Sequence, residues 1–496
     1  MRYGLYYFAF FLFFLFSFSG VKAQQGNEEH CASHTLHEKL LETDPTYAKQ
    51  HIRNENEIQD LVQAMQASAG NGSQAQVFGD TLEIPVVVHV IHTGQNVGVG
   101  ANISTAQING AIEAINDRYR KTPNTHGDAA GVDTEIQFIL AKRDPDCNAT
   151  TGIVRVNGSS VTDYSNEGIT AGQGSGADEL EVKALSRWPA TDYVNVWVVT
   201  EIENNNGGFG IQGYAYFPGV SPVRDGIIIM HSAFGVSGTV NSWNNLNRTF
   251  THEVGHYLNL YHTFEGDNSG NNCPGTTNGC GSGSGDCCTD TEPHIRAASN
   301  CPTGANSCTS ASWADVQHNY MNYSSQTCAD MFSEDQSDRM RAALFGPRSS
   351  LLTSLGTEAP SSNTVASASC SPNTTNLSNG FGMGITNVTF ENIDVNSSSA
   401  VGDSGYRDYS CHQMAEVFPS TTYSISINSG TSNDEDVRVY IDFNDDGDFL
   451  DANEFVFTND TDTLHTGNIV IPSNPTLNTP LRMRVISDWQ GNTAAM

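Results

Sequence analysis

The chain has 496 residues, which is long enough for two or three domains. It carries 55 Asp and Glu against 23 Lys and Arg, giving a formal net charge of −32 at pH 7. Because phosphate binding needs a basic face, this charge argues against a nucleic-acid partner. Eleven cysteines, seven of them between Cys273 and Cys328, indicate disulfides and an oxidising compartment. The odd number leaves at least one cysteine without an intrachain partner.

The N-terminus has the pattern of a secretory signal peptide. Arg2 precedes an apolar run over 5–18 that is too short to span a bilayer comfortably. Val21-Lys22-Ala23 then offers small residues at the positions that a signal peptidase reads. We therefore expect cleavage after residue 23 and a secreted, extracellular protein, with an uncleaved anchor as the alternative. No later apolar run is suited to a membrane span.

Residues 24–80 read as a polar pro-segment. Apolar residues recur at helical spacing over 36–41 and 47–67, and a Gly-Asn-Gly-Ser break over 70–73 reads as a linker. A buried strand is predicted at 82–91, and a helix at 104–120 with Ser104 as its N-cap. Further strands are predicted at 134–140, 193–202 and 226–231, which together indicate an α/β lobe.

Within the stretch Thr251 to His262, the residues from His252 onward read H-E-x-x-H-x-x-N-x-x-H. His252 and His256 lie four residues apart, so they share one face of a helix and can reach one metal ion. A straight helix would carry His262 away from that ion, so the helix must stop between them. Asn259 stands where the stop is needed, and Asn tolerates the left-handed conformation of a helix C-terminus. The pattern predicts a zinc site with Glu253 beside it.

Cys31 is the lone cysteine of the leader. Its thiolate is a candidate zinc ligand that would keep a zymogen latent. The alternatives are a disulfide with Cys147 and a free thiol.

The chain becomes irregular after His262 and changes character again near its end. Residues 265–290 are rich in Gly, Asn, Asp and Cys, so disulfides and structural calcium are expected to hold them. Ser333 then begins a helix with Gln336 as its capping-box partner. After a linker over 356–368, short strands are expected up to Met496, where the terminal module looks truncated. Within it, four side chains resemble the opening of an EF-hand calcium loop: Asp442, Asn444, Asp446 and Asp448.

The zinc signature, together with a methionine turn at 319–324, resembles the metzincins. The sequence resembles the pappalysin (cytophagalysin) family in particular. The segments that carry this resemblance are 251–264, 290–293, 328–333 and Asp338-Arg339-Met340. This resemblance covers about residues 80–350, and the terminal module resembles a GEVED-type module. It implies an α/β (α+β) metzincin catalytic domain with a twisted mixed sheet and an active-site helix over 81–355, followed by a β-sandwich over 369–496.

The resemblance also implies roles for individual residues. His252, His256 and His262 would bind zinc, Glu253 would be the general base, Met321 would form the apolar floor, and Tyr323 would assist the oxyanion. It further implies disulfides Cys301–Cys328 and Cys273–Cys308. Adding Cys370–Cys411 leaves four cysteines for two more pairs: Cys147, Cys280, Cys287 and Cys288. Some members carry an acidic residue where this chain has Gln326 and prefer Arg after the cut bond, so that preference is not carried over.

The function implied is that of a secreted zinc endopeptidase, in which Glu253 activates a water molecule on the zinc and protein or peptide substrates are cut. Substrate is expected to lie extended along an edge strand drawn from 207–217. The alternatives are a non-catalytic, calcium-binding adhesion protein and another zinc hydrolase such as an amidase. Oligomeric state has no signal in the sequence.

Overall fold

The computed structural model describes residues 30–69, 81–128, 130–274, 285–297, 300–310, 312, 316–360, 365–369, 383–396, 407–410, 413–430 and 433–489. The expected signal peptide, the 70–73 linker and the Cys370–Cys411 pair lie outside these residues. Among the helices that the structure describes, none combines the length and the apolar character that a bilayer span requires.

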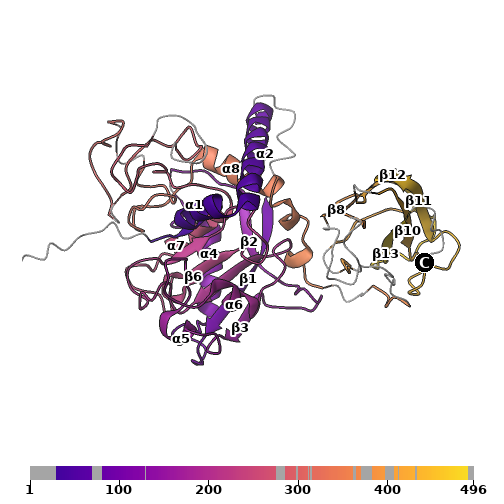
Figure 1. Cartoon of the computed structure of the whole chain (residues 1–496), viewed down its shortest axis with the longest axis horizontal. Helices are drawn as coiled ribbons and strands as arrows, with labels where there is room; N and C mark the ends of the chain where they lie inside the picture. The colour runs from indigo at the N-terminus through magenta and orange to yellow at the C-terminus, as the bar shows by residue number, and fades with distance from the viewer. Residues whose placement is uncertain are drawn as a thin grey trace, which may run out of the picture.

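A six-stranded mixed sheet forms the centre of the larger unit (Figure 1). Its strand order is β2-β1-β4-β6-β5, and β3 also pairs with β1. All pairs are parallel except the edge strand β5, which runs antiparallel to β6. The strands are β1 (Leu82–His92), β2 (Ile136–Leu140), β3 (Ile153–Asn157), β4 (Val194–Val199), β5 (Gly213–Ala215) and β6 (Ile227–Met230).

The central strands are apolar along their whole length because both faces of the sheet are covered. Positions 84 to 91 of β1 and all of β4 are buried, which is the pattern of a parallel strand between two layers. The helices of this unit are α4 (Thr105–Tyr119), α5 (Tyr164–Glu167), α6 (Glu179–Ala184), α7 (Arg248–Tyr257) and α8 (Glu334–Phe345). Of these, α4 packs on β2, and α7 packs on β5 and β6. Short 3-10 turns occur at His231–Ala233, Ser349–Leu351 and Leu355–Thr357.

Two of the predicted helix starts are confirmed by their caps. The Ser104 side chain accepts a hydrogen bond from the Gln107 backbone N–H, and α4 follows directly. Ser333 and Gln336 form the reciprocal capping box at the start of α8. Each cap satisfies backbone N–H groups that the first helical turn leaves without partners.

The leader, which the sequence predicts to be a pro-segment, forms two helices that lie against the larger unit (Figure 1). They are α1 (Ser33–Thr43) and α2 (Pro45–Ala69), as the helical spacing predicted. Ile58 and Met65 of α2 pack on Ala342 and Ala343 of α8 in a small apolar cluster. The pro-segment is therefore docked through a defined interface.

The C-terminal region has its own apolar core between two antiparallel sheets, which confirms the expected β-module. One sheet has the order β11-β10-β13 and the other β12-β9-β7-β8. The strands are β7 (Asn387–Phe390), β8 (Ile393–Asn396), β9 (Thr422–Asn428), β10 (Glu435–Ile441), β11 (Phe455–Asp462), β12 (Leu464–Val470) and β13 (Met483–Trp489).

Two of the expected disulfides are confirmed, and one expectation about cysteines is wrong. Cys273–Cys308 and Cys301–Cys328 are bonded, with Cα atoms 5.5 and 5.9 Å apart. Cys147 and Cys287 are also in disulfides. Cys288, expected in a disulfide, is instead a buried free thiol. The Cys288 thiol donates to the Asp286 carbonyl, with the Sγ atom 3.6 Å from the oxygen. Cys31 is likewise free, so the alternative of a Cys31–Cys147 disulfide is also wrong.

Candidate metal centre

Helix α7 carries the first two histidines and is fixed at both ends. At its start, the Asn247 amide donates to the Ala111 carbonyl (2.8 Å) and accepts from the Gly235 N–H (2.7 Å). At its end, Asn259 has a φ of 71°, in the left-handed region, and its N–H donates to the His256 carbonyl. The chain therefore turns at Asn259, as expected from its position, and returns His262 towards the helix.

The structure brings the three histidines to one point. Their Nε2 atoms form a triangle with sides of 3.1 Å. The Nδ1 atoms of His252 and His256 lie 2.8 Å from the Tyr320 carbonyl and 2.7 Å from the Leu260 carbonyl. Since a carbonyl only accepts, Nδ1 carries the proton and the Nε2 lone pairs face one another. Lone pairs that point at one another repel, and a cation between them removes this repulsion.

Burial favours the neutral imidazoles that a metal requires. Loss of solvent lowers the pKa of His256 to about 3 and lowers the pKa values of His252 and His262 well below the ordinary range, with repulsion between the rings adding to it. The 3.1 Å spacing is close to what ligands about 2.0–2.1 Å from a tetrahedral zinc ion adopt. The donor set therefore fits zinc.

Met321 packs directly beneath α7. A Cβ placed on Gly255 would meet the Met321 Sδ at 2.4 Å, so only glycine allows this approach. Met321 is fully buried, and its neighbour Tyr320 supplies the carbonyl that holds His252. The turn at 319–322 thus fixes both the packing under the histidines and the orientation of one of them.

Glu253 lies beside the histidines and is completely buried. Its Oε2 accepts hydrogen bonds from the Ser33 hydroxyl (2.9 Å) and the Cys31 thiol (3.3 Å), while Oε1 has no protein partner. Burial raises the pKa of this carboxyl to about 8, against the two hydrogen bonds, which lower it. A carboxyl with such a pKa can hold a proton and release it near neutral pH.

Cys31 joins the three histidines in one cluster, with one ligand atom from each residue lying within 4.8 Å of the others. Its position is set by backbone pairing with the edge strand of the sheet. The Gln212 N–H donates to the His30 carbonyl (2.8 Å), and the Ala32 N–H donates to the Gly213 carbonyl (3.3 Å). The leader therefore occupies the edge of β5 in parallel orientation.

Tyr323 packs with Cys31 and Phe264 in a small buried cluster beside the histidines. Its ring centroid is 5.0 Å from that of His262 and 5.9 Å from that of His252. Its hydroxyl donates to the Cys31 carbonyl at 3.4 Å. In this form of the protein the leader thus contacts both Glu253 and Tyr323.

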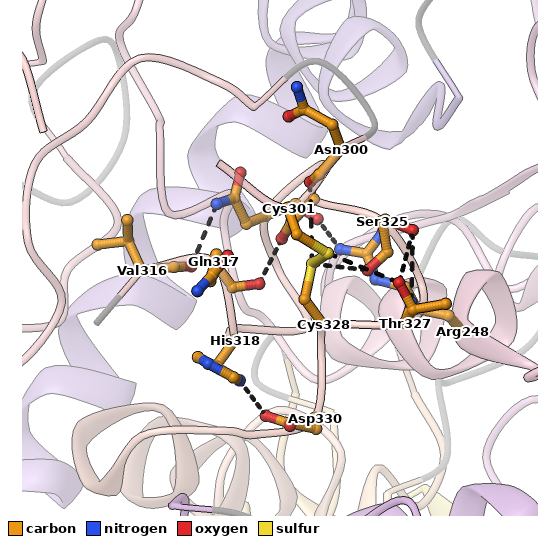
Figure 2. The surroundings of a disulfide bond; sticks show 12 residues. Arg248, Asn300, Cys301, Val316, Gln317, His318, Ser325, Thr327, Cys328 and Asp330 are labelled. Atoms are coloured by element: carbon orange, nitrogen blue, oxygen red, sulfur yellow. Dashed lines mark hydrogen bonds and ion pairs between the residues drawn. A yellow bond between two sulfur atoms is a disulfide. The ribbon is translucent and has the colours of Figure 1, made fainter. Parts of the chain in front are cut away.

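The segment that follows Tyr323 is tied to the loop that precedes α7. The Cys301–Cys328 disulfide holds this segment, and Figure 2 places Arg248 beside it and beside Ser325 and Thr327. Arg248 donates to the Asn322 carbonyl. The Gln326 amide accepts from the Leu246 N–H (2.9 Å) and donates to the Trp243 carbonyl (2.7 Å). Gln326 therefore joins two segments of the chain through its amide, at the position where some family members carry an acidic residue.

The acidic loop of the C-terminal module is arranged differently from an EF-hand opening. The Asp442 carboxylate is buried and accepts from the backbone N–H groups of Asp445, Asp446 and Gly447. The Asn444 amide donates to Asp446 and Asp451. The carboxylates that approach within 4.8 Å of one another belong to Asp446, Asp448 and Asp451. Asp451 was not among the residues expected there.

Sequence reasoning missed several residues of the leader that contact the site, among them His30, Ser33, His34 and Glu55. Ser33 lies two positions after Cys31, so its contact with Glu253 had a local signal. Glu55 lies on α2 and accepts from the Asn259 amide at 2.7 Å, across 204 residues of sequence. No sequence pattern pairs these two positions.

Comparison with known proteins agrees with this geometry. The family model described as pregnancy-associated plasma protein-A (Peptidase_M43) matches residues 178–345, and the GEVED domain model matches 436–496. An extracellular metalloprotease of Pyricularia oryzae is 31% identical over 277 residues, 55% of this chain and 78% of that protein. One of Neurospora crassa is 30% identical over 299 residues, 59% of this chain and 84% of that protein.

A solved structure covers a comparable part of the chain. A glutamate-to-alanine mutant of promirolysin from Tannerella forsythia is 29% identical, with a TM-score of 0.50. The match covers 67% of this chain and all of that one. The matched chain therefore has the length of the larger unit rather than that of the whole protein.

Proposed function

The chain belongs to the pappalysin (Peptidase_M43) family of metallopeptidases, and from this premise we propose that it is a secreted zinc endopeptidase with Glu253 as its general base. The observation that carries the proposal is the triangle of Nε2 atoms beside a buried carboxyl group that has one oxygen without a protein partner. Secretion is supported by the predicted signal peptide over 1–23 and by relatives described as extracellular metalloproteases.

His252, His256 and His262 would hold the zinc ion. When bound, zinc would lower the pKa of a water molecule and polarise the peptide carbonyl. Glu253 would take a proton from the attacking water and pass it to the amine that leaves. The Tyr323 hydroxyl would donate a hydrogen bond to the oxyanion that develops on the carbonyl. For either step the leader must first leave, because it contacts both side chains in this structure.

A Glu253→Gln variant tests the assignment of the base. The amide keeps the size of the side chain but cannot take a proton, so we expect zinc content to stay at the wild-type level while peptidase activity falls by roughly 10²- to 10⁴-fold or more. Cleavage of a quenched peptide by the activated protein and zinc content by mass spectrometry are the two measurements. Glu113→Gln, an exposed site on α4, is the control and should remain fully active. Near-wild-type activity of Glu253→Gln would contradict the assignment.

We further propose that the leader keeps the enzyme latent through Cys31. The proposal is supported by the thiol's place within the histidine cluster and by the pairing of the leader with the edge strand. A Cys31→Ala variant should show activity before any cleavage of the pro-segment and should mature faster. The lag before activity appears in freshly purified protein measures this. Cys288→Ala removes the other described free, buried thiol and should leave the lag unchanged. Equal lags in the two variants would refute the role of Cys31.

Calcium in the C-terminal module stays a prediction from the sequence. It is supported by the approach of the Asp446, Asp448 and Asp451 carboxylates. Asp442 and Asn444 would serve by shaping the loop, because their side chains already bind its backbone and its neighbours.

A further inference from the structure

Two large aromatic side chains are exposed together near the metal centre. Phe209 is 67% exposed and Trp243 is 40% exposed. Their rings stack on each other, with centroids 5.1 Å apart and planes at 18°. Single exposed apolar side chains are ordinary on a protein surface, but a stacked pair contributed by two separate loops forms a continuous apolar platform. We call these two residues the aromatic pair.

The two loops that carry the aromatic pair are tied to each other. The Asn241 amide donates to the Gly207 carbonyl at 3.0 Å. Asn244 donates to the Gln212 side chain at 2.6 Å, and the Asn205 amide donates to the Ile211 carbonyl at 2.7 Å. These bonds hold the rings in place without burying them. Because the two loops are already held in place, a ligand that binds to this exposed platform costs little conformational entropy.

The aromatic pair continues the surface on which the leader is seated. Phe209 is four residues before Gly213, whose carbonyl accepts the leader's Ala32 N–H. Four residues span at most about 14 Å, so Phe209 lies within that distance of the edge strand beside Glu253. On the other side, the Trp243 carbonyl accepts from Gln326, which belongs to the segment after Tyr323. The aromatic pair is thus joined to two walls of the site.

The direction of a bound peptide depends on how it pairs with β5. The leader pairs with this edge in parallel orientation. A substrate that instead adds to β5 as an antiparallel strand, with its scissile bond near Gly213, runs from there towards Gln212 and Phe209. Its residues after the scissile bond therefore approach the aromatic pair. At about 3.3 Å per residue, the second to fourth residues after the bond come within reach.

We propose that the aromatic pair is a specificity subsite that binds an apolar or aromatic side chain of the substrate, two to four residues after the scissile bond. This inference rests on the proposed peptidase function and deepens it. The chemistry is burial of apolar surface against two stacked rings. Gln326 adds no charge there, and its amide is already used by Leu246 and Trp243.

The test is a cleavage profile of the activated full chain on a library of peptides, read by mass spectrometry. Wild-type protein should enrich Leu, Phe and Tyr at one position two to four residues after the cut. The Phe209→Ala/Trp243→Ala double variant should lose this enrichment. On a matched pair of quenched peptides with Phe or Ser at that position, kcat/KM for the Phe peptide should fall by about tenfold, and kcat/KM for the Ser peptide should not change. Phe418→Ala, a similarly exposed aromatic in the C-terminal module, is the control.

Three results would overturn the proposal. They are an unchanged profile in the double variant, enrichment on the N-terminal side of the cut only, and a preference for Arg or Lys at the position concerned. If wild-type protein cleaves peptides without any preference there, the subsite alone is wrong. If wild-type protein cleaves no peptide at all, the proposed function is wrong and the subsite with it.

Discussion

At two positions of the metal centre, the backbone geometry rather than a reactive side chain explains which amino acid is present. Asn259 adopts a φ of 71°, and its side chain also donates to Glu55 of the leader. Gly255 leaves room for the Met321 sulfur, which an alanine Cβ would meet at 2.4 Å. The consequence is that two residues without catalytic groups determine where His262 and Met321 lie.

Glu55 of the leader forms a buried ion pair with Arg339. Its two carboxylate oxygens each lie 2.7 Å from the Arg339 guanidinium, and the Arg339 Nε donates to the Asn259 carbonyl at 2.9 Å. Burial alone raises the pKa of Glu55, but Arg339 and Asn259 outweigh it and hold the pKa below its ordinary value. At pH values above the ordinary pKa of a glutamate, the contact therefore stabilises the folded protein. This stabilisation is lost as the pH falls through the lowered pKa of Glu55.

A Glu55→Gln variant tests the weight of this contact. Replacing one partner of a buried pair leaves the other charge uncompensated, at a cost of about 3–5 kcal/mol when the partner is removed completely, and less for the amide. At neutral pH we expect faster cutting of the pro-segment by added trypsin and earlier onset of activity. Time courses on gels measure the first effect, and a quenched peptide measures the second. Glu57→Gln, exposed on the same helix, should behave as wild type. Identical time courses would show that Arg339 does not hold the leader.

At the scale of elements, long segments with a clear pattern were predictable from the sequence. β1 is a continuous apolar run, α4 and α8 begin at capping residues, and α7 ends where Asn259 stands in the motif. In each case, the interactions that form the element lie within it or directly beside it in the sequence. The three histidines proposed to bind zinc belong to this group, because helix periodicity and one turn bring them together.

Elements that depend on distant partners have little signal of their own in the sequence. An edge strand within 207–217 was expected only from the family resemblance. In the structure, β5 has three residues and exists because it pairs with β6 and, on its other edge, with the leader at Cys31. β3 was missed because its partially buried sequence lacks a strong pattern until it pairs with β1. The Glu55–Arg339 contact joins positions 284 residues apart. The same limit explains Cys288, since sequence alone does not distinguish it from Cys287.

At the scale of the whole molecule, the two largest apolar cores of the described residues share no member. The larger core lies around the β1–β6 sheet, and the smaller one lies between the two C-terminal sheets. All three histidines of the metal centre come from the larger unit, at α7 and the turn that follows it. Metal binding should therefore stabilise one core and leave the other unaffected.

This difference predicts two thermal transitions, of which only one responds to zinc removal. A ligand at about 1,000 times its dissociation constant stabilises the state that binds it by roughly 4 kcal/mol. For a unit of this size that corresponds to a shift of about 10 °C. We expect 1,10-phenanthroline to lower one transition by about this amount and to leave the other in place in a calorimetric scan. His252→Ala should show the lowered transition with or without the chelator, because it lacks a ligand. A single transition that moves as a whole would mean that the two cores unfold together, and that zinc stabilises the C-terminal module through contacts with the catalytic unit.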